Sequence, residues 1–248
     1  MTNKTVNFST RAPKGMDKDK TKAETQKILK KLDELQNVLY AQAKYSVLIV
    51  MQGLDAAGKD GAIKNIFTGV NPQGCSVKPF KAPTKEELSY DFLWRIHKHV
   101  PAKGMIQIFN RSHYEDVLVP RVEKWIDIKE VQRRFEAINN FEQLLQRHNN
   151  TIIIKFFLNI SKEKQQEKFK ERLTDPAKKW KYNADDQKAA DNYDQYLNAY
   201  KDLIKVCSPD IPWTIVPSDQ NWYKEHLIAK TIVETLKKLK MKYPDVVK

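Results

Sequence analysis

Residues 53–61 have the spacing of a phosphate-binding loop, and we call them the phosphate loop. Gly53 and Gly58 stand five positions apart and Lys59 follows directly, in a chain with only seven glycines. This spacing lets backbone N–H groups point at phosphate oxygens at a helix N-terminus, and the lysine adds charge for a transferred group. The alternative is a flexible strand-to-helix turn. The predicted phosphate-binding residues are Gly53, Ala56, Ala57, Gly58, Lys59, Asp60 and Gly61.

Two carboxylates in the phosphate loop indicate a metal ion. Asp60 occupies the position after the lysine, where a Ser or Thr hydroxyl commonly reaches magnesium, and Asp55 lies inside the turn. Because carboxylates repel a nearby polyanion unless cations lie between them, we expect bound Mg2+, with Asp55 as the better ligand. A second role stays open for Asp60, since an acid in a first helical turn also favours the helix dipole.

A second polar cluster follows the apolar run 105–109 and comprises residues 110–116. The guanidinium of Arg111 can hold a phosphate with two hydrogen bonds and neutralise charge during transfer, or it can pair with Glu115 or Asp116. Glu115 can carry metal or pair with Arg111. We expect His113 to be structural, because phosphoryl transfer depends on positioning and charge more than on proton abstraction.

A third, basic cluster covers residues 172–181. Pro176 ends a helical segment there, and the following residues lack a strong apolar period. We expect a mobile lid over the phosphates, with a solvated linker as the alternative.

Composition limits the classes of protein to which the chain can belong. With 248 residues, 41% hydrophobic and 30% charged, it is predicted to form one soluble α/β domain, with or without an inserted lid. No apolar run approaches the ~20 residues of a membrane span, and the polar N-terminus does not resemble a secretory signal. Cys75 and Cys207 have neither disulfide nor zinc spacing, which fits a reducing cytoplasm.

The net charge of +13 indicates an anionic partner: nucleic acid, an acidic membrane surface or a phosphate-rich substrate. The basic residues are spread along the chain and match no common nucleic-acid-binding module, which disfavours nucleic acid.

Strand and helix patterns alternate along the chain. Apolar runs predict strands at 45–51, 76–80, 105–109, 151–158 and 213–216. Helices are predicted at 22–40, 59–68, 84–99, 128–148, 161–173 (with Asn159 and Ser161 as caps) and 221–240. Thr84 and Glu87 have the form of a capping box for the third of these helices. The alternation predicts a parallel sheet covered on both faces, with a ligand site at the carboxyl ends of its strands.

Residues 53–61, 80–84, 110–115 and 172–176 resemble, in order and spacing, the motifs of the polyphosphate kinase 2 family. The similarity extends over about residues 25–240. It implies a P-loop kinase-like, three-layer α/β/α fold with a parallel central sheet and a helical lid. It also implies Mg2+-dependent phosphoryl transfer, for which Mn2+ can substitute, between inorganic polyphosphate and adenine or guanine nucleotides. By resemblance, the catalytic residues are Asp55, Lys59, Arg111 and Arg172, and the nucleotide- or polyphosphate-binding residues are Lys81, Thr84, Glu115, Lys178 and Lys181.

Two residues depart from the pattern of many family members. Asn110 stands where many have an aspartate, and an amide is a poorer magnesium ligand. Glu115 stands where many have an asparagine. This form resembles the class III subgroup, which phosphorylates both nucleoside mono- and diphosphates, so the implied chemistry is AMP to ADP to ATP on one enzyme.

The predicted organisation is a flexible basic segment at 1–22 and a single P-loop kinase domain at 23–248, with a lid at about 172–200. A cytoplasmic homo-oligomer, dimer or tetramer, is expected, without nucleic-acid or membrane partners. Two alternatives stay open: an ATP-dependent nucleoside monophosphate kinase, and a non-enzymatic nucleic-acid-binding protein, which would also explain the charge.

Overall fold

The computed structural model describes residues 8–181, 190–207 and 209–245. Within them, five strands form one parallel sheet in the order β2-β3-β1-β4-β5. The strands are β1 (Ser46–Gly53), β2 (Cys75–Pro79), β3 (Ile106–Asn110), β4 (Thr151–Asn159) and β5 (Trp213–Pro217). The central strand β1 therefore ends between the carboxyl ends of β3 and β4, where side chains that follow three strands can meet.

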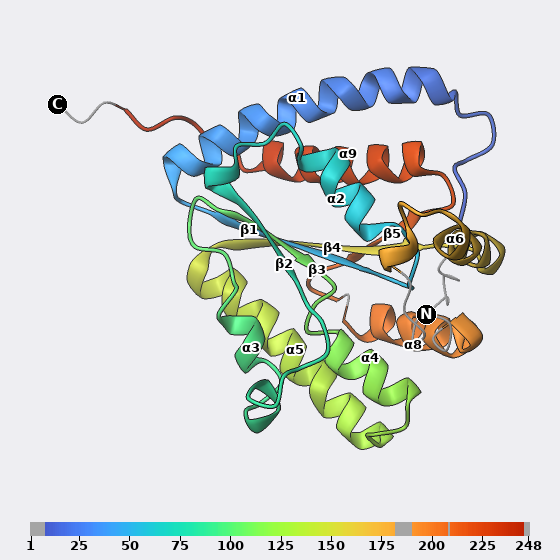
Figure 1. The fold of residues 1–248 in the computed structure, drawn as a ribbon. Coiled ribbons are helices and arrows are strands. Elements are labelled where there is room, and N and C mark those ends of the chain that lie inside the picture. Colours follow the sequence, from blue (N-terminus) through green and yellow to red (C-terminus); the bar gives the residue numbers. More distant parts are fainter. Residues whose placement is uncertain (1–7, 182–189, 208, 246–248) are drawn as a thin grey trace, which may run out of the picture.

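Helices cover both faces of the sheet (Figure 1). On one face lie α1 (Lys18–Gln42), α2 (Lys59–Phe67) and α9 (Asn221–Lys238). On the other lie α3 (Trp94–His97), α4 (Glu115–Val122), α5 (Ile128–Asn149) and α8 (Tyr193–Val206). Helix α6 (Lys162–Thr174) follows β4 at the carboxyl edge of the sheet. This arrangement confirms the predicted three-layer α/β/α fold.

Burial on both faces explains why β1 and β4 are apolar. Every residue of β1 is buried, as is nearly every residue of β4. Strands covered on both faces are typically continuous apolar runs rather than alternating ones. Caps set the helix starts: the side chains of Asp17, Asp127 and Ser161 accept hydrogen bonds from first-turn N–H groups of α1, α5 and α6. None of the helices in the described parts of the chain combines the length and hydropathy that a membrane span requires.

The predicted helix at 84–99 is wrong, although its capping box forms. The N–H of Thr84 donates to the Glu87 carboxylate at 2.8 Å, and the N–H of Glu87 donates to Thr84 Oγ1 at 3.2 Å. Only a short 3-10 helix, Glu87–Ser89, follows, because Tyr90 adopts an extended conformation. Asp91 then accepts from the N–H of Leu93 at 2.9 Å and begins a separate turn that leads into α3. Helix α4 was not predicted from the sequence either.

The described residues of the predicted flexible N-terminal segment contact the domain. Asn159 is not a helix cap, since its Nδ2 donates to the carbonyl oxygens of Phe8 at 2.6 Å and Ser9 at 3.1 Å. The N–H of Ala12 donates to Gln220 at 2.9 Å. Helix α1 begins at Lys18, before the predicted boundary at residue 22. Residues 1–7 lie outside the described residues.

The predicted lid at about 172–200 includes the end of α6, a 3-10 helix at Lys179–Lys181 and the first half of α8. Residues 182–189 lie outside the described residues. Helix α8 lies beside α4 beneath the sheet (Figure 1), and its Tyr200 is buried. Helix α8 therefore packs below the carboxyl ends of the strands.

Candidate active site

Two glycines shape the phosphate loop at the end of β1. A Cβ atom at Gly53 would lie 2.6 Å from the carbonyl oxygen of Leu158 in β4, so only glycine fits this close approach. Gly58 has φ of +87°, which L side chains rarely adopt, and it is the N-cap of α2. The loop thus turns from β1 into α2, and its last residues lie at a helix N-terminus.

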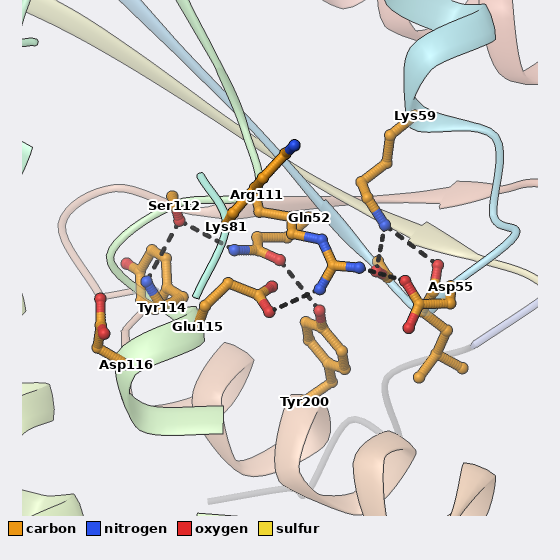
Figure 2. Close-up of polar contacts among 12 residues, drawn as sticks. Gln52, Asp55, Lys59, Lys81, Arg111, Ser112, Tyr114, Glu115, Asp116 and Tyr200 are labelled. Atoms are coloured by element: carbon orange, nitrogen blue, oxygen red, sulfur yellow. Dashed lines mark hydrogen bonds and ion pairs between the residues drawn. The ribbon is translucent and has the colours of Figure 1, made fainter. Parts of the chain in front are cut away.

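Lys59 folds back over the phosphate loop and is buried. Its Nζ donates to the carbonyl oxygens of Gly53 at 2.7 Å and Leu54 at 3.2 Å (Figure 2). Burial, followed by the charge of Arg111, lowers the pKa of Lys59 to about 8, against the opposing effect of nearby carboxylates. An anionic phosphate beside this ammonium would favour its charged form.

Arg111 lies between two carboxylates (Figure 2). Its Nη2 pairs with Asp55 of the phosphate loop, and its Nη1 pairs with Glu115 at 3.0 Å. The charge of Glu115, more than that of Asp55, raises the pKa of the guanidinium, so it stays charged. The backbone of Arg111 has φ of +62°, an uncommon conformation for a residue with a side chain and one that tends to occur at functional sites. The predicted alternative, pairing with Glu115, is thus present together with a second ion pair to Asp55.

Gln52, the last side chain of β1 before the loop, forms a hydrogen bond with Glu115. The amide orientation that satisfies all neighbours has its nitrogen donating to Glu115 Oε1 at 2.8 Å and to the Tyr200 hydroxyl oxygen at 3.0 Å. Its oxygen then accepts from Ser112 at 3.0 Å. This buried group joins β1, the segment after β3 and helix α8, so it determines where Glu115 and its partner Arg111 lie.

Asn110, one of the two departures from the family pattern, contacts Asp60 of the phosphate loop. Nδ2 of Asn110, at the end of β3, donates to Oδ1 of Asp60, in the first turn of α2, at 2.7 Å. An aspartate at position 110 would bring two carboxylates together here. The amide at position 110 and the acid at position 60 are therefore compatible as a pair.

The other predicted site residues have different surroundings. Arg172 lies in the last turn of α6, with its guanidinium 5.0 Å from the ring centroid of Phe169. Lys178 pairs with Glu171 at 3.0 Å and Asp175 at 3.3 Å. The Lys81 side chain is exposed, and Thr84 belongs to the capping box described above. The side chain of Lys181 lies outside the described residues. The structure thus brings together Asp55, Lys59, Arg111 and Glu115, whereas the ammonium of Lys178 pairs with two carboxylates of its own segment.

Several side chains that the sequence analysis missed surround the same site. A small pocket between the phosphate loop and α8 is lined in part by Leu118, Gln165, Tyr196 and Tyr200. Gln165 donates to the carbonyl oxygen of Asp55 at 2.9 Å. The sequence does contain a signal for Gln52, because this residue is polar at the end of an otherwise apolar strand and directly precedes the loop. For Tyr196 and Tyr200 the only signal in the sequence was their spacing of four residues, which places them on one face of a helix.

A buried charge network supports the segment after β3. Nζ of Lys155, in β4, donates to Glu142 of α5 at 2.7 Å, to the Tyr114 hydroxyl at 3.0 Å and to the carbonyl oxygen of Cys207 at 2.7 Å. The ring of His113 is fully buried, with Nε2 3.2 Å from the Glu142 carboxylate. His113 therefore belongs to the structural support beneath the loop.

The donor set suits a metal that is held largely by its substrate. Within the described ranges, no group of three or more His, Cys, Asp or Glu side chains is arranged to hold a metal ion. Asp55 uses Oδ1 for Arg111, and its second carboxylate oxygen takes no part in that ion pair. Mg2+ commonly takes one or two carboxylates together with phosphate and water oxygens, so this set fits Mg2+ bound with a phosphate substrate.

A phosphate loop after the central strand, facing an arginine from the neighbouring strand of a parallel sheet, is the arrangement of P-loop kinase-like phosphotransferases. The chain belongs to the polyphosphate kinase 2 family: the model described as Polyphosphate kinase 2 (PPK2) matches residues 15–244. The family resemblance seen in the sequence is thereby confirmed.

Relatives and solved structures agree with this membership. The chain is 45% identical to the AMP/ADP-polyphosphate phosphotransferase of Meiothermus ruber, over 87% of this chain and 80% of the relative. It is 41% identical to the ADP-polyphosphate phosphotransferase of Rhodopseudomonas palustris, over 88% and 79% of the two chains. The crystal structure of Polyphosphate Kinase 2 from Arthrobacter aurescens TC1 superposes with a TM-score of 0.89 at 36% identity, covering 97% of this chain and 94% of that one.

Proposed function

We propose that this protein transfers phosphoryl groups from inorganic polyphosphate to nucleoside mono- and diphosphates, converting AMP to ADP and ADP to ATP with Mg2+. The observation that carries the proposal is the meeting of Lys59, Arg111 and Asp55 at the carboxyl end of β1. Its class of substrate follows from family membership and from the similarity to the AMP/ADP-polyphosphate phosphotransferase of Meiothermus ruber.

The residues act by positioning and charge. Phosphoryl transfer spreads negative charge over the oxygens of the transferred group, and preorganised cations there lower the barrier without a covalent intermediate. Lys59 Nζ and the N–H groups at the start of α2 hold the donor phosphate. Arg111, kept in place by Asp55 and Glu115, exchanges one carboxylate for a phosphate oxygen when substrate arrives. Arg172 closes over the transferred group from the lid.

The proposed Mg2+ site consists of Asp55 with the substrate phosphates, and Mn2+ can replace Mg2+ there. When bound, the ion neutralises phosphate charge and aligns the reacting oxygens. Glu115 is a weaker candidate ligand, because Arg111 and Gln52 already contact both of its carboxylate oxygens. Asn110 contributes no charge and orients Asp60 instead.

The net charge of +13 fits a long polyanionic donor, which a positive surface attracts in a salt-dependent manner. We further propose that the protein is cytoplasmic and forms a homo-oligomer, either a dimer or a tetramer. Sedimentation equilibrium would measure its oligomeric state.

The test is to incubate the protein with AMP and Mg2+ and either polyphosphate or ATP, and to resolve ADP and ATP over time. The proposal predicts ADP followed by ATP with polyphosphate. Product with ATP alone would instead establish a nucleoside monophosphate kinase. Binding of duplex nucleic acid without any nucleotide product would refute an enzymatic role. ADP that accumulates without conversion would refute the second acceptor but keep the class of enzyme.

A further inference from the structure

Two lysines outside the sequence motifs contact the phosphate loop from neighbouring helices. Lys224, in the first turn of α9, is 1% exposed, and its Nζ donates to the carbonyl oxygen of Ala57 at 3.2 Å. Lys168, in α6, donates from Nζ to the carbonyl oxygen of Ala56 at 3.0 Å. Each ammonium group therefore holds one of two successive loop peptides.

Both ammonium groups lie against Gly58. A Cβ atom at Gly58 would clash with Nζ of Lys224 and would lie 3.5 Å from Nζ of Lys168. The glycine thus serves a second purpose besides its positive φ, because its missing side chain leaves room for the Lys224 ammonium. Asn221 fixes that ammonium from the other side, with Oδ1 accepting at 3.0 Å.

The contact to Ala57 determines where the next N–H points. In a trans peptide the C=O and N–H vectors are antiparallel, and no cis peptide occurs in the described residues. The carbonyl of Ala57 points at Lys224, so the N–H of Gly58 points away from that lysine. This N–H is a donor that a phosphate-binding loop uses for its anion.

The lysine also lies at a buried site, where an ammonium charge is costly. Burial, then the neighbouring charge of Lys168, lowers the pKa of Lys224 to about 7, while Glu225 on its own helix raises it and Lys59 of α2 lowers it. A bound polyanion would raise it again, because an opposite charge favours the ammonium form.

We propose that Lys224 is a positioning residue for the polyphosphate donor: it holds the Ala57 peptide so that the Gly58 N–H faces the phosphate, with Lys168 holding the preceding peptide. The inference rests on the proposed function, since it assumes that the phosphate loop binds polyphosphate. It adds a residue of the last helix, distant in sequence from the loop, to the donor site.

The experiment compares Lys224→Met with Lys237→Met, which removes the same charge from an exposed position on the same helix. Isothermal titration calorimetry with inorganic tripolyphosphate measures donor binding, and steady-state kinetics with polyphosphate and AMP measures turnover. For Lys224→Met we expect about tenfold weaker tripolyphosphate binding and a lower kcat, with the KM for AMP within about twofold of the parent. Lys237→Met should match the parent protein.

A pH series separates positioning from a purely structural role. The ratio of the two variants' dissociation constants should change across about pH 6 to 9, because only the protein that retains Lys224 gains or loses its proton there. The proposal would be overturned if Lys224→Met reduced thermal stability but left tripolyphosphate binding unchanged and the ratio of the dissociation constants constant over this pH range.

Should Lys224→Met fail to fold, the same measurements on Lys168→Met, with the exposed Lys170→Met as its control, test the second peptide contact. Equal tripolyphosphate binding by this pair would overturn the proposal. If the parent protein neither binds tripolyphosphate nor uses polyphosphate, the proposed function itself fails. A parent that uses polyphosphate while Lys224→Met equals Lys237→Met refutes only the role of Lys224.

Discussion

The buried pair of Lys155 and Glu142 gives the sharpest stability prediction. The two side chains are 0% and 2% exposed, and their charged atoms are 2.7 Å apart. Burial alone would raise the pKa of Glu142, but the hydrogen bond with His113 and the charge of Lys155 outweigh burial and lower it. Glu142 is therefore held as a carboxylate in its ion pair with Lys155, and removal of either partner leaves the other buried away from water.

The magnitude follows from this burial. Lys155→Met should cost about 3–5 kcal/mol, because the buried Glu142 carboxylate loses the ammonium group that compensates its charge, and Glu142→Gln should cost a similar amount by leaving that ammonium without its carboxylate. The double variant Lys155→Met/Glu142→Gln removes both charges and keeps an amide oxygen for the Tyr114 hydroxyl. It should lie within about 2 kcal/mol of the parent, and so be more stable than either single variant.

Urea unfolding with linear extrapolation measures these differences, and Lys129→Met, an exposed lysine on α5, is the control for loss of one charge. The control should change the unfolding free energy by less than about 0.5 kcal/mol. A cost below about 1 kcal/mol for Lys155→Met would refute the reasoning. A double variant that is no more stable than the more stable of the two single variants would also refute it.

Three further predictions concern the site itself. Lys59→Ala and Arg111→Ala should each reduce turnover by about three orders of magnitude with an unchanged circular dichroism spectrum, and near-normal transfer would remove that residue from the mechanism. Because burial holds the pKa of Lys224 at about 7, below its ordinary value, the unfolded chain binds the extra proton between those values and stability rises with pH there. From pH 7 to 9 the parent should therefore gain about 2–3 kcal/mol relative to Lys224→Met in urea unfolding, and parallel curves would contradict this. Asn110→Asp places a carboxylate oxygen near the atom that now lies 2.7 Å from Asp60 Oδ1, so the metal-free protein should lose about 1 kcal/mol and recover it with Mg2+. Melting curves with EDTA or MgCl2 that are the same as the parent's would show that the two groups do not interact.

Local sequence patterns predicted most of the helix and strand positions, but the predicted helix at 84–99 was wrong. The apolar runs 45–51 and 151–158 correspond to β1 and β4, and the cap at Ser161 forms as predicted. The helix at 84–99 failed because Asp91 bonds to its own backbone and begins a new turn, a local alternative to the helix that the apolar period does not record. The apolar pattern also could not separate α4 from the polar segment that precedes it.

The sequence by itself determined the phosphate loop, its lysine and the arginine after the neighbouring strand, because glycine spacing, charge and strand order are local properties of the chain. Tertiary structure alone decided their partners. Asn110 and Asp60 are 50 positions apart, and Lys224 reaches Ala57 across 167. Such contacts depend on which strands and helices become neighbours, and a one-dimensional pattern carries no distance between them. The sequence of the phosphate loop therefore indicates phosphate binding, whereas the fold determines which amide, acid and lysine hold that loop in place.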